Sequence, residues 1–292
     1  MATPFILGTT GALLCERVGV VNLGIEGIMT MGALAGWLVA LATGSLWLGV
    51  LAASLSGALL GAVHGLMTVA LGLSQHVVGI GISLLGVSLS SFLFRTLTPQ
   101  AAGIKISSFQ PIGLPLLEGI PFLGPVLNQQ TILTYLALVL LLAVAYGLYR
   151  TPLGLAARMV GENPDAAAAQ GISILGIRMG GVILGSAIMG IAGCYLSLSA
   201  FDTFVINLVA GRGWICIALI VFASWKPARI FFGALFFAFV DAMQLRLQQE
   251  FRLPYQLFLM LPYLLSIVVL IGASRNSRAP QALMSPYRKG QR

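Results

Sequence analysis

The chain of 292 residues is poor in charged residues, cysteine and histidine, and each scarcity excludes a class of protein. Charged residues make up 8% of the chain and hydrophobic residues 58%, and the mean hydropathy is +0.98. Soluble domains are about 25% charged and about 45–50% apolar. This composition therefore excludes a soluble domain and indicates a membrane protein.

The residues that build metal and redox sites are scarce. The three cysteines, Cys15, Cys194 and Cys216, are far apart in apolar sequence, which is typical of buried thiols. His64 and His76 have no cysteine or carboxylate at ligand spacing, so no metal site is predicted.

Catalytic and nucleotide-binding motifs are also missing from the sequence. It has no GxxxxGK[ST] run, no GxSxG and no HExxH. We find no grouping of nucleophile, acid and base that a membrane enzyme would need. We therefore expect no covalent chemistry, and any ATP that drives this protein must bind to another chain.

Long runs with little charge are abundant, and a transmembrane helix needs about 20 such residues. Eight candidate spans are predicted, at residues 25–44, 46–73, 76–97, 131–149, 177–198, 213–225, 228–247 and 253–273. Residues 4–15 are too short to cross alone and lack the features of a signal peptide, so we expect a half helix or a truncated first span. No linker divides the chain, which predicts a single transmembrane domain over residues 1–292.

The net charge of +8 comes from basic residues that mark one side of the membrane. They cluster at residues 150–178, at residues 226–229 and in a C-terminal tail at residues 274–292. Even numbers of spans separate these clusters, so the positive-inside rule places all three in the cytoplasm and residues 98–128 outside. Because the basic residues form no soluble face, no nucleic-acid partner is predicted.

A polar island at residues 153–171 has the signals of a short helix. Asn163 suits the N-cap, Pro164 the first helical position, Asp165 the positive end of the helix dipole, and Gly171 the end of the helix. A helix of about seven residues is marginal in water, so it needs a surface to pack on. That surface belongs either to this chain or to a partner.

A second polar interruption, ERVGVVNLGIEG, occupies residues 16–27. Its glycines permit an unwound backbone, which is tolerated at membrane depth only when buried in protein or lining a wet cavity. A break of that kind would place Asn22 and Glu26 beside a translocation path. A cytoplasmic turn in which Glu16 and Arg17 face water explains the same residues, and spacing alone does not choose.

A polar stripe formed by Asp241, Gln244 and Gln248 follows helical spacing on one predicted span. An acidic side chain near the bilayer centre costs ~2.5–3.5 kcal/mol on insertion scales, so it is expected to have a partner or a function. The stripe either bonds helices together or lines a path.

Pairs of small residues at four-residue spacing, such as Gly57 with Gly61 and Gly181 with Gly185, allow helices to approach closely. Their simplest interpretation is packing.

Several segments, in order, carry a resemblance to a known family. They are ERVGVVNLGIEGIMTMGA (16–33) and TPLGLAARMVGENPDAAAAQGI (151–172), followed by GRGWICIAL, WKPARIFFGALFF, DAMQLRLQ and MLPYLLSIVVL. Together they resemble the inner-membrane permease subunits of bacterial ABC importers, in the nucleoside and simple-sugar branch that is related to the branched-chain amino acid permeases. The likeness covers nearly the whole chain. It implies an all-α, polytopic bundle of about eight to ten spans in the bacterial plasma (inner) membrane, similar to a type II ABC importer permease.

The resemblance also implies partners. A cytoplasmic coupling segment at about residues 150–176 would dock on an ATP-binding subunit, which holds ATP and Mg²⁺ and drives a rigid-body shift of the bundle. Its expected coupling residues are Arg158, Gly161, Glu162, Asn163, Pro164, Asp165 and Gly171. A second permease, either a sister chain or another copy, would complete the pore, and an extracytoplasmic binding protein would deliver the solute.

The same resemblance places Asn22 and Glu26 beside the path and favours a nucleoside or related purine over a simple sugar. Neutral polar groups such as Asn22, Gln244 and Gln248 suit an uncharged, hydrogen-bonding solute.

Two departures from the family pattern are visible. Family members carry a further apolar segment ahead of Pro4, so we expect a shortened start. ASWK at residues 223–226 replaces a usual glycine after the phenylalanine, which we interpret as a packing variation.

Two other functions remain open from the residues. An ion-coupled secondary transporter would work through Glu26 and Asp241. A structural membrane scaffold would tolerate loss of the polar island.

Overall fold

The computed structural model describes residues 1–98, 104–113, 130–250, 260–274 and 279–287, which are almost entirely helical. The α-helices are α1 (Ala2–Arg17), α2 (Ile25–Thr43), α3 (Leu46–Gly65), α4 (Gln75–Leu97), α6 (Ile132–Arg150), α7 (Pro152–Glu162), α8 (Pro164–Ala169), α9 (Ile174–Tyr195), α10 (Arg212–Phe222), α11 (Pro227–Glu250) and α13 (Leu261–Ser274). Single π-helical turns, η1 (Leu66–Ala70) and η3 (Leu196–Ala200), extend α3 and α9. Two short strands, β1 (Pro111–Ile112) and β2 (Gln130–Thr131), pair antiparallel. The helical membrane-protein fold is confirmed.

Six helices in the described part of the chain are long and apolar enough to cross a bilayer. They are α2, α3 with η1, α4, α6, α9 with η3, and the first 18 residues of α11. They match six of the eight predicted spans. Helix α10 has 11 residues and covers about 16 Å, against a hydrocarbon core of about 30 Å, so it cannot cross alone. The described part of α13 is also short, and the count of eight to ten spans stays a prediction.

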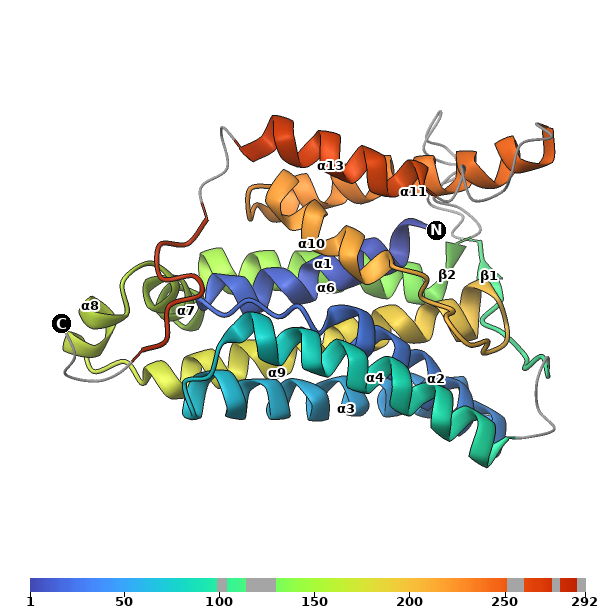
Figure 1. The fold of residues 1–292 in the computed structure, drawn as a ribbon, viewed down its shortest axis with the longest axis horizontal. Coiled ribbons are helices and arrows are strands. Elements are labelled where there is room, and N and C mark those ends of the chain that lie inside the picture. Colours follow the sequence, from blue (N-terminus) through green and yellow to red (C-terminus); the bar gives the residue numbers. More distant parts are fainter. Residues whose placement is uncertain (99–103, 114–129, 251–259, 275–278, 288–292) are drawn as a thin grey trace.

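Helix α1, expected as a half helix or a truncated span, has 16 residues and is buried along nearly its whole length. Figure 1 shows it inside the bundle, with α2, α3, α4 and α9 on one side and α10, α11 and α13 on the other. Its buried side chains, among them Phe5, Leu7 and Leu13, belong to one hydrophobic cluster that α2, α9 and α10 share. The first helix is therefore the core around which the others pack.

Glycines set the close contacts of α9, as the small-residue spacing predicts. A Cβ on Gly185 would overlap the carbonyl oxygen of Gly11 in α1, and a Cβ on Gly57 in α3 would overlap the carbonyl oxygen of Ser186. Backbones that approach this closely leave no space for side chains between the helices.

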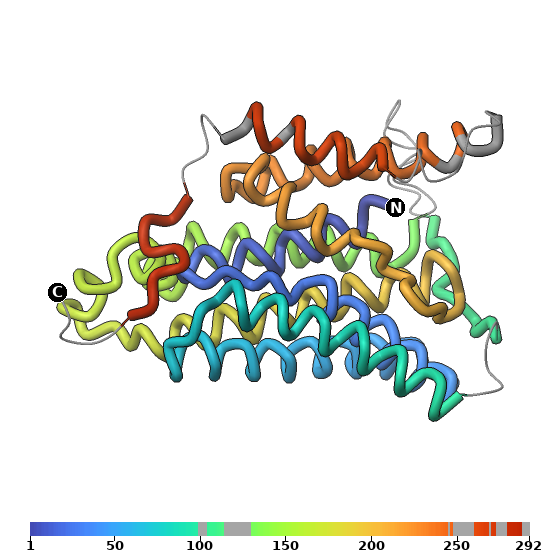
Figure 2. Tube along the Cα trace, in the orientation of Figure 1, coloured from blue at the N-terminus to red at the C-terminus, as the bar shows by residue number. Residues whose placement is uncertain are grey.

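The two ends of the bundle differ. Helices α7 and α8 lie at one end, where residues 279–287 of the C-terminal tail run beside them (Figure 2). The strands lie at the opposite end, where Ile106 N donates to the carbonyl oxygen of Asp202. Much of the predicted outer segment 98–128 lies outside the described residues. So do the basic residues of the tail, Arg275, Arg278, Arg288, Lys289 and Arg292.

Candidate solute path and coupling segment

Residues 18–24, between α1 and α2, are irregular and largely buried, as an unwound segment requires. Side chains from two other helices satisfy the backbone of Val21: Gln75 Oε1 accepts from its N–H at 2.8 Å, and His64 Nε2 lies 3.2 Å from its carbonyl oxygen. Irregular backbone inside a membrane protein needs partners of this kind. Glu16 is 5% exposed, so the interpretation in which it faces water is wrong.

Asn22 is buried and bonded to protein at both ends of its amide. Its Nδ2 donates to Ser186 Oγ at 3.1 Å, and its Oδ1 accepts from Gly24 N at 2.9 Å. It therefore ties the irregular segment to α9. It is not among the residues that line the polar pocket described below.

Glu26 binds the N-terminus of α10. Its two carboxylate oxygens accept from Gly211 N at 2.7 Å and Gly213 N at 2.8 Å. These N–H groups lack partners within the helix, and a carboxylate also suits the positive end of the helix dipole. Only a residue without a Cβ fits at Gly213, because a Cβ there would lie 2.7 Å from Glu26 Oε2. The N-terminus of α10 therefore lies directly against Glu26 of α2, and Gly213 leaves the space that this contact needs.

Asp241 on α11 pairs with Arg212, the first residue of α10. Arg212 Nη2 donates to Asp241 Oδ2 at 3.1 Å, and Arg212 Nη1 donates to the carbonyl oxygen of Val209 at 3.2 Å. The two side chains are 13% and 11% exposed. A counter-charge is what an acidic group among apolar helices needs.

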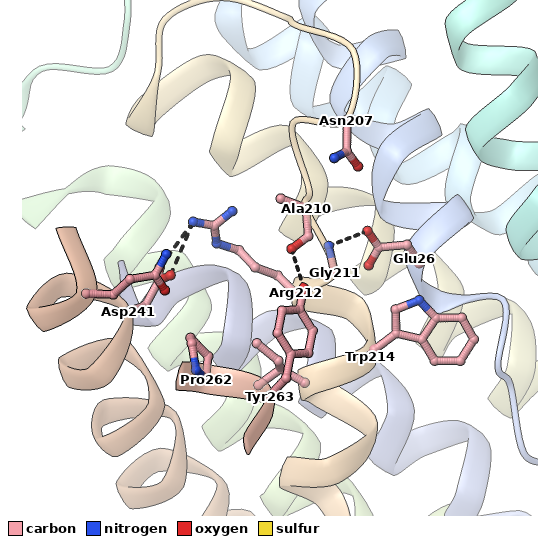
Figure 3. A pocket seen from close by; sticks show the side chains of 11 residues that line it. Glu26, Asn207, Ala210, Gly211, Arg212, Trp214, Asp241, Pro262 and Tyr263 are labelled. Carbon is pink, nitrogen blue, oxygen red and sulfur yellow. Dashed lines mark hydrogen bonds and ion pairs between the residues drawn. The ribbon is translucent and has the colours of Figure 1, made fainter. Parts of the chain in front are cut away.

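These groups surround a cavity of about 460 Å³, here called the polar pocket (Figure 3). Its lining residues are Glu26, Asn207, Ala210, Gly211, Arg212, Trp214, Ile215, Asp241, Gln244, Pro262 and Tyr263. The volume lies within the range of about 300–1,000 Å³ that small-molecule sites occupy. The pocket contains both signs of charge, and each charge already has a partner, so its chemistry fits an uncharged polar solute.

Three of the five candidate path residues thus meet in one place: Glu26, Asp241 and Gln244. Asn22 lies elsewhere, against α9. Gln248 belongs to α11, but its side chain is outside the described residues.

Sequence reasoning missed Arg212, Trp214 and Tyr263. Tyr263 donates its hydroxyl to the carbonyl oxygen of Ala210 at 2.8 Å, and the side chains of Trp214 and Tyr263 remain about 40% exposed. Arg212 could have been found, because an intramembrane aspartate predicts a cationic partner and Arg212 comes directly before the predicted span 213–225. Trp214 and Tyr263 lie in the family-like segments GRGWICIAL and MLPYLLSIVVL, but nothing in their spacing placed them at a pocket.

The polar island forms two helices, α7 and α8, where one was expected. The local signals of the second are confirmed: Asn163 Oδ1 accepts from Ala166 N at 3.0 Å, and Pro164 and Asp165 occupy the first turn of α8. Gly171 follows with a φ of +78°, the left-handed conformation that ends helices.

The surface under the candidate coupling segment (residues 150–176) belongs to this chain. Val160 and Ala167 are buried in a cluster with Ile174 of α9, and Tyr287 of the tail packs against it. A Cβ on Gly161 would overlap the carbonyl oxygen of Arg17, so α7 rests directly on the end of α1. The buried face of the polar island therefore packs on this chain and not on a partner.

Charged residues of the coupling segment link it to neighbours. Glu162 Oε1 lies 3.9 Å from Arg17 Nη1, and Glu162 Oε2 accepts from Gln281 N at 3.2 Å. The guanidinium of Arg158 lies 5.0 Å from the centre of the Tyr149 ring, a cation–π distance. Leu153 and Leu155 are exposed on the outer face of α7.

The end of α10 opposite the pocket is bonded to the end of α1. Trp225 Nε1 donates to Glu16 Oε2 at 2.6 Å, and Arg17 Nη2 donates to the carbonyl oxygen of Trp225 at 2.7 Å. Ser224 and Trp225 have φ of 48° and 55°, which is uncommon for residues other than glycine. Ala223, the first residue of the ASWK segment, is fully buried.

Among the described residues, no group of three His, Cys, Asp or Glu side chains is placed to hold a metal ion. The three cysteines are buried free thiols, as expected.

Comparison with known proteins identifies relatives over nearly the whole chain. Residues 1–270 match the family described as branched-chain amino acid transport system / permease component. The guanosine ABC transporter permease protein NupQ of Bacillus subtilis is 35% identical over 100% of this chain and 95% of its own length. The nucleoside ABC transporter permease protein NupC of Lactococcus lactis is 32% identical over 96% of this chain and 92% of its own. A protein of Haloferax volcanii, provisionally named a glucose ABC transporter permease, is 38% identical over 85% of this chain and 75% of its own. No solved structure matches the chain.

Proposed function

This chain belongs to the family of permease components of branched-chain amino acid transport systems, and from that premise we propose that it forms part of the pore of an ATP-driven importer for nucleosides. Relatives whose names state nucleoside or guanosine transport cover 96% and 100% of the chain, which supports this solute class. As a permease it is a multi-pass membrane protein and a transport component, with no chemistry of its own. We place it in the plasma (inner) membrane of a bacterium.

The observation that carries the proposal is the polar pocket, which gathers charged and amide side chains among largely apolar helices. Charged and amide groups among apolar helices are costly and are retained where they pair or line a path. Here Arg212 and Asp241 pair, while Gln244 and the aromatic rings of Trp214 and Tyr263 border the same space. Glu26, Asp241 and Gln244 would therefore line the solute path, with Gln248 further along α11.

The pocket favours a nucleoside over a simple sugar. An exposed indole offers a flat apolar face on which a purine stacks, and stacking on aromatic side chains contributes ~1–3 kcal/mol per base. The amide of Gln244 and the Arg212–Asp241 pair present donors and acceptors suited to the edge of a base.

The coupling segment would bind an ATP-binding subunit, which holds ATP and Mg²⁺. The exposed face of α7, with Leu153 and Leu155, and the α7–α8 junction at Glu162 and Asn163 provide the docking surface. A second permease would complete the pore, and an extracytoplasmic binding protein would deliver the solute.

Ion coupling through Glu26 and Asp241 fits the geometry less well. Glu26 is bonded to two backbone N–H groups and Asp241 to Arg212, so both carboxylates already have partners. An ion-coupled transporter needs a carboxylate that can exchange partners with the ion.

The test begins with affinity purification of the tagged chain from gently solubilised native membranes. We expect an ATP-binding chain and a second permease to co-purify. Proteoliposomes of that complex, supplied with its binding protein, should take up radiolabelled guanosine in an ATP-dependent manner, and unlabelled glucose should not compete. Uptake that survives ATP depletion and stops when an ion gradient is collapsed would refute the proposal.

A matched pair of variants tests the pocket. Trp214→Ala removes the stacking face, and guanosine uptake should fall roughly tenfold, in line with the loss of one base–aromatic stack. Trp47→Ala makes the same change at an exposed position near the strand end of the bundle, where uptake should stay at the parent level.

A further inference from the structure

Helix α10 is bonded at both ends to one short stretch of sequence. Glu26 accepts from the N–H groups of Gly211 and Gly213 at its start, and Glu16 accepts from Trp225 Nε1 just beyond its end. Glu16 and Glu26 are the two glutamates of ERVGVVNLGIEG. This stretch and α10 therefore form a closed frame, held by carboxylates at opposite ends of a helix about 16 Å long.

Near the C-terminal end of α10, the frame contacts the coupling segment. Arg17 donates to the carbonyl oxygen of Trp225, and its guanidinium also lies 3.9 Å from Glu162. Gly161 rests on the backbone of Arg17 without space for a Cβ. A displacement of α7 would therefore act directly on the residues that hold Trp225.

At the N-terminal end of α10, the frame borders the polar pocket. Arg212 at the start of α10 is bonded to Asp241 on α11, and the carbonyl oxygen of Ala210 accepts from Tyr263 on α13. These two contacts join the frame to the helices on the far side of the pocket (Figure 3). Each contact depends on a polar group at the tip of one side chain, so it can break and re-form without unwinding a helix.

The backbone at Trp225 carries strain. Two successive non-glycine residues, Ser224 and Trp225, have positive φ. Such conformations persist where surrounding contacts hold them, and they gather at functional sites. The contacts that hold Trp225 are backbone hydrogen bonds within this turn and the bonds to Glu16 and Arg17.

We propose that α10 is a connecting helix: the Glu16–Arg17–Trp225 cluster transmits movement of the coupling segment along α10 to the Arg212–Asp241 pair, and so opens and closes the polar pocket. Glu16, Arg17 and Trp225 are positioning residues that touch no solute. The helix moves as a rigid body because its internal hydrogen bonds are intact. Its polar contacts at the two ends carry the movement from Trp225 to Arg212. The inference rests on the proposed function, since the movement starts with ATP on a partner chain.

Trp225→Phe tests the connecting helix. It removes the Nε1 donor while keeping an aromatic ring and the carbonyl oxygen that Arg17 binds. The control, Trp47→Phe, makes the same change at an exposed position on α3. Two quantities are measured on the purified native complex: the basal rate of ATP hydrolysis, and the solute transported per ATP hydrolysed.

A third measurement reports the pocket end of α10. Ile206→Cys places a thiol on an exposed residue next in sequence to Asn207, which lines the pocket, and the three native cysteines are buried. Its rate of labelling by a membrane-impermeant maleimide is compared with and without Mg-ATP and vanadate. In the parent complex Mg-ATP should change this rate.

With Trp225→Phe we expect basal ATP hydrolysis to persist, the ATP-dependent change in labelling to disappear, and transport per ATP to fall about tenfold, the effect of losing one hydrogen bond to a charged acceptor. Trp47→Phe should match the parent in all three measurements. An undiminished labelling change in Trp225→Phe would overturn the connecting helix while leaving the importer function intact.

Failure of the proposed function gives a different result. If no ATP-hydrolysing chain co-purifies with the parent, the importer assignment fails and the connecting helix fails with it. If Trp225→Phe yields no folded complex, Arg17→Gln is measured in its place, because it removes the bond to the Trp225 carbonyl and the contact with Glu162. Loss of the ATP-dependent change in labelling would then support the connecting helix, and an undiminished change would overturn it. In a double-mutant cycle, Glu16→Gln should add little to Trp225→Phe, as expected for two residues that act through one bond.

Discussion

Helices α9 and α10 share one core but differ in their closest contacts, which are between backbones for α9 and between polar groups at the two ends for α10. Helix α9 meets α1, α2 and α3 through glycines whose absent side chains bring backbone against backbone, at Gly185, Gly190 and Gly193. Helix α10 also packs apolar side chains such as Leu219 and Ile220 into the core. It differs in having polar contacts at both ends, through Glu26, Arg212 and Trp225. The close backbone contacts of α9 cannot change unless the packing is rebuilt, whereas each polar contact of α10 depends on one side chain.

The largest effect is expected from breaking the packing of α9. A Cβ at Gly193 would overlap the carbonyl oxygen of Met29, and neither backbone can yield. Gly193→Val should therefore lower the yield of folded protein severely, beyond the ~1–3 kcal/mol typical of overpacked cores. Size-exclusion profiles and thermal unfolding in detergent measure this. Gly180→Val, on the same helix with open space at its Cβ position, is the control and should fold normally. Equal yields of the two variants would contradict the description of α9 as a packed core.

Breaking the ion pair between Arg212 of α10 and Asp241 should affect transport more than folding. Asp241→Asn keeps the shape of the side chain and removes the charge that faces Arg212. We expect uptake to fall on the order of tenfold, which corresponds to ~1.4 kcal/mol, with the complex still assembled. Asp202→Asn, at the strand end of the bundle, serves as the control. The double variant Arg212→Gln with Asp241→Asn should cost less than the sum of the single variants. Loss of assembly with no specific loss of uptake would assign the pair to folding alone.

A smaller effect is expected from substitutions in the coupling segment. Glu162→Ala with Asn163→Ala removes the cap of α8 and the contacts to Arg17 and Gln281. A helix cap contributes ~1 kcal/mol, so stimulation of ATP hydrolysis by the loaded binding protein should fall about fivefold. Basal ATP hydrolysis should stay unchanged. Normal stimulation in this double variant would count against docking at the α7–α8 junction.

The smallest effect is expected at Tyr263, on the far side of the pocket. Tyr263→Phe removes the hydroxyl that donates to the carbonyl oxygen of Ala210 and keeps the ring. Because the side chain is partly exposed, water can replace this bond, and uptake should fall only about twofold, at the low end for a neutral hydrogen bond. A loss as large as that of Asp241→Asn would mean that the α13 contact, and not the ion pair, is the principal joint of α10.

The sequence predicted most of the helices and the second helix of the polar island, because these depend on neighbouring residues. Asn163, Pro164 and Gly171 act on backbone groups within a few positions of themselves, so their roles were readable in advance. The stripe of Asp241 and Gln244 was also visible, since helical spacing fixes which side chains share a face. What the stripe faces was not visible.

Partners distant in sequence could not be predicted. Glu26 meets Gly211 and Gly213 across 185 and 187 positions, and Glu16 meets Trp225 across 209. Asn22 looked like a companion of Glu26 because the two share one motif, yet the chain turns between them and directs Asn22 toward α9. Spacing along an irregular segment does not fix direction, because its backbone has no period.

The sequence by itself determined that this is a helical membrane protein, where most of its helices lie, and that it carries a capped helix in a polar island. Hydropathy and capping decide these features, and both act over a few residues. Only the tertiary structure decided that α10 is too short to cross, that both its ends are bonded to one motif, and that Arg212 is the partner of Asp241. Those features depend on how closely distant backbones approach, which glycines permit but do not specify.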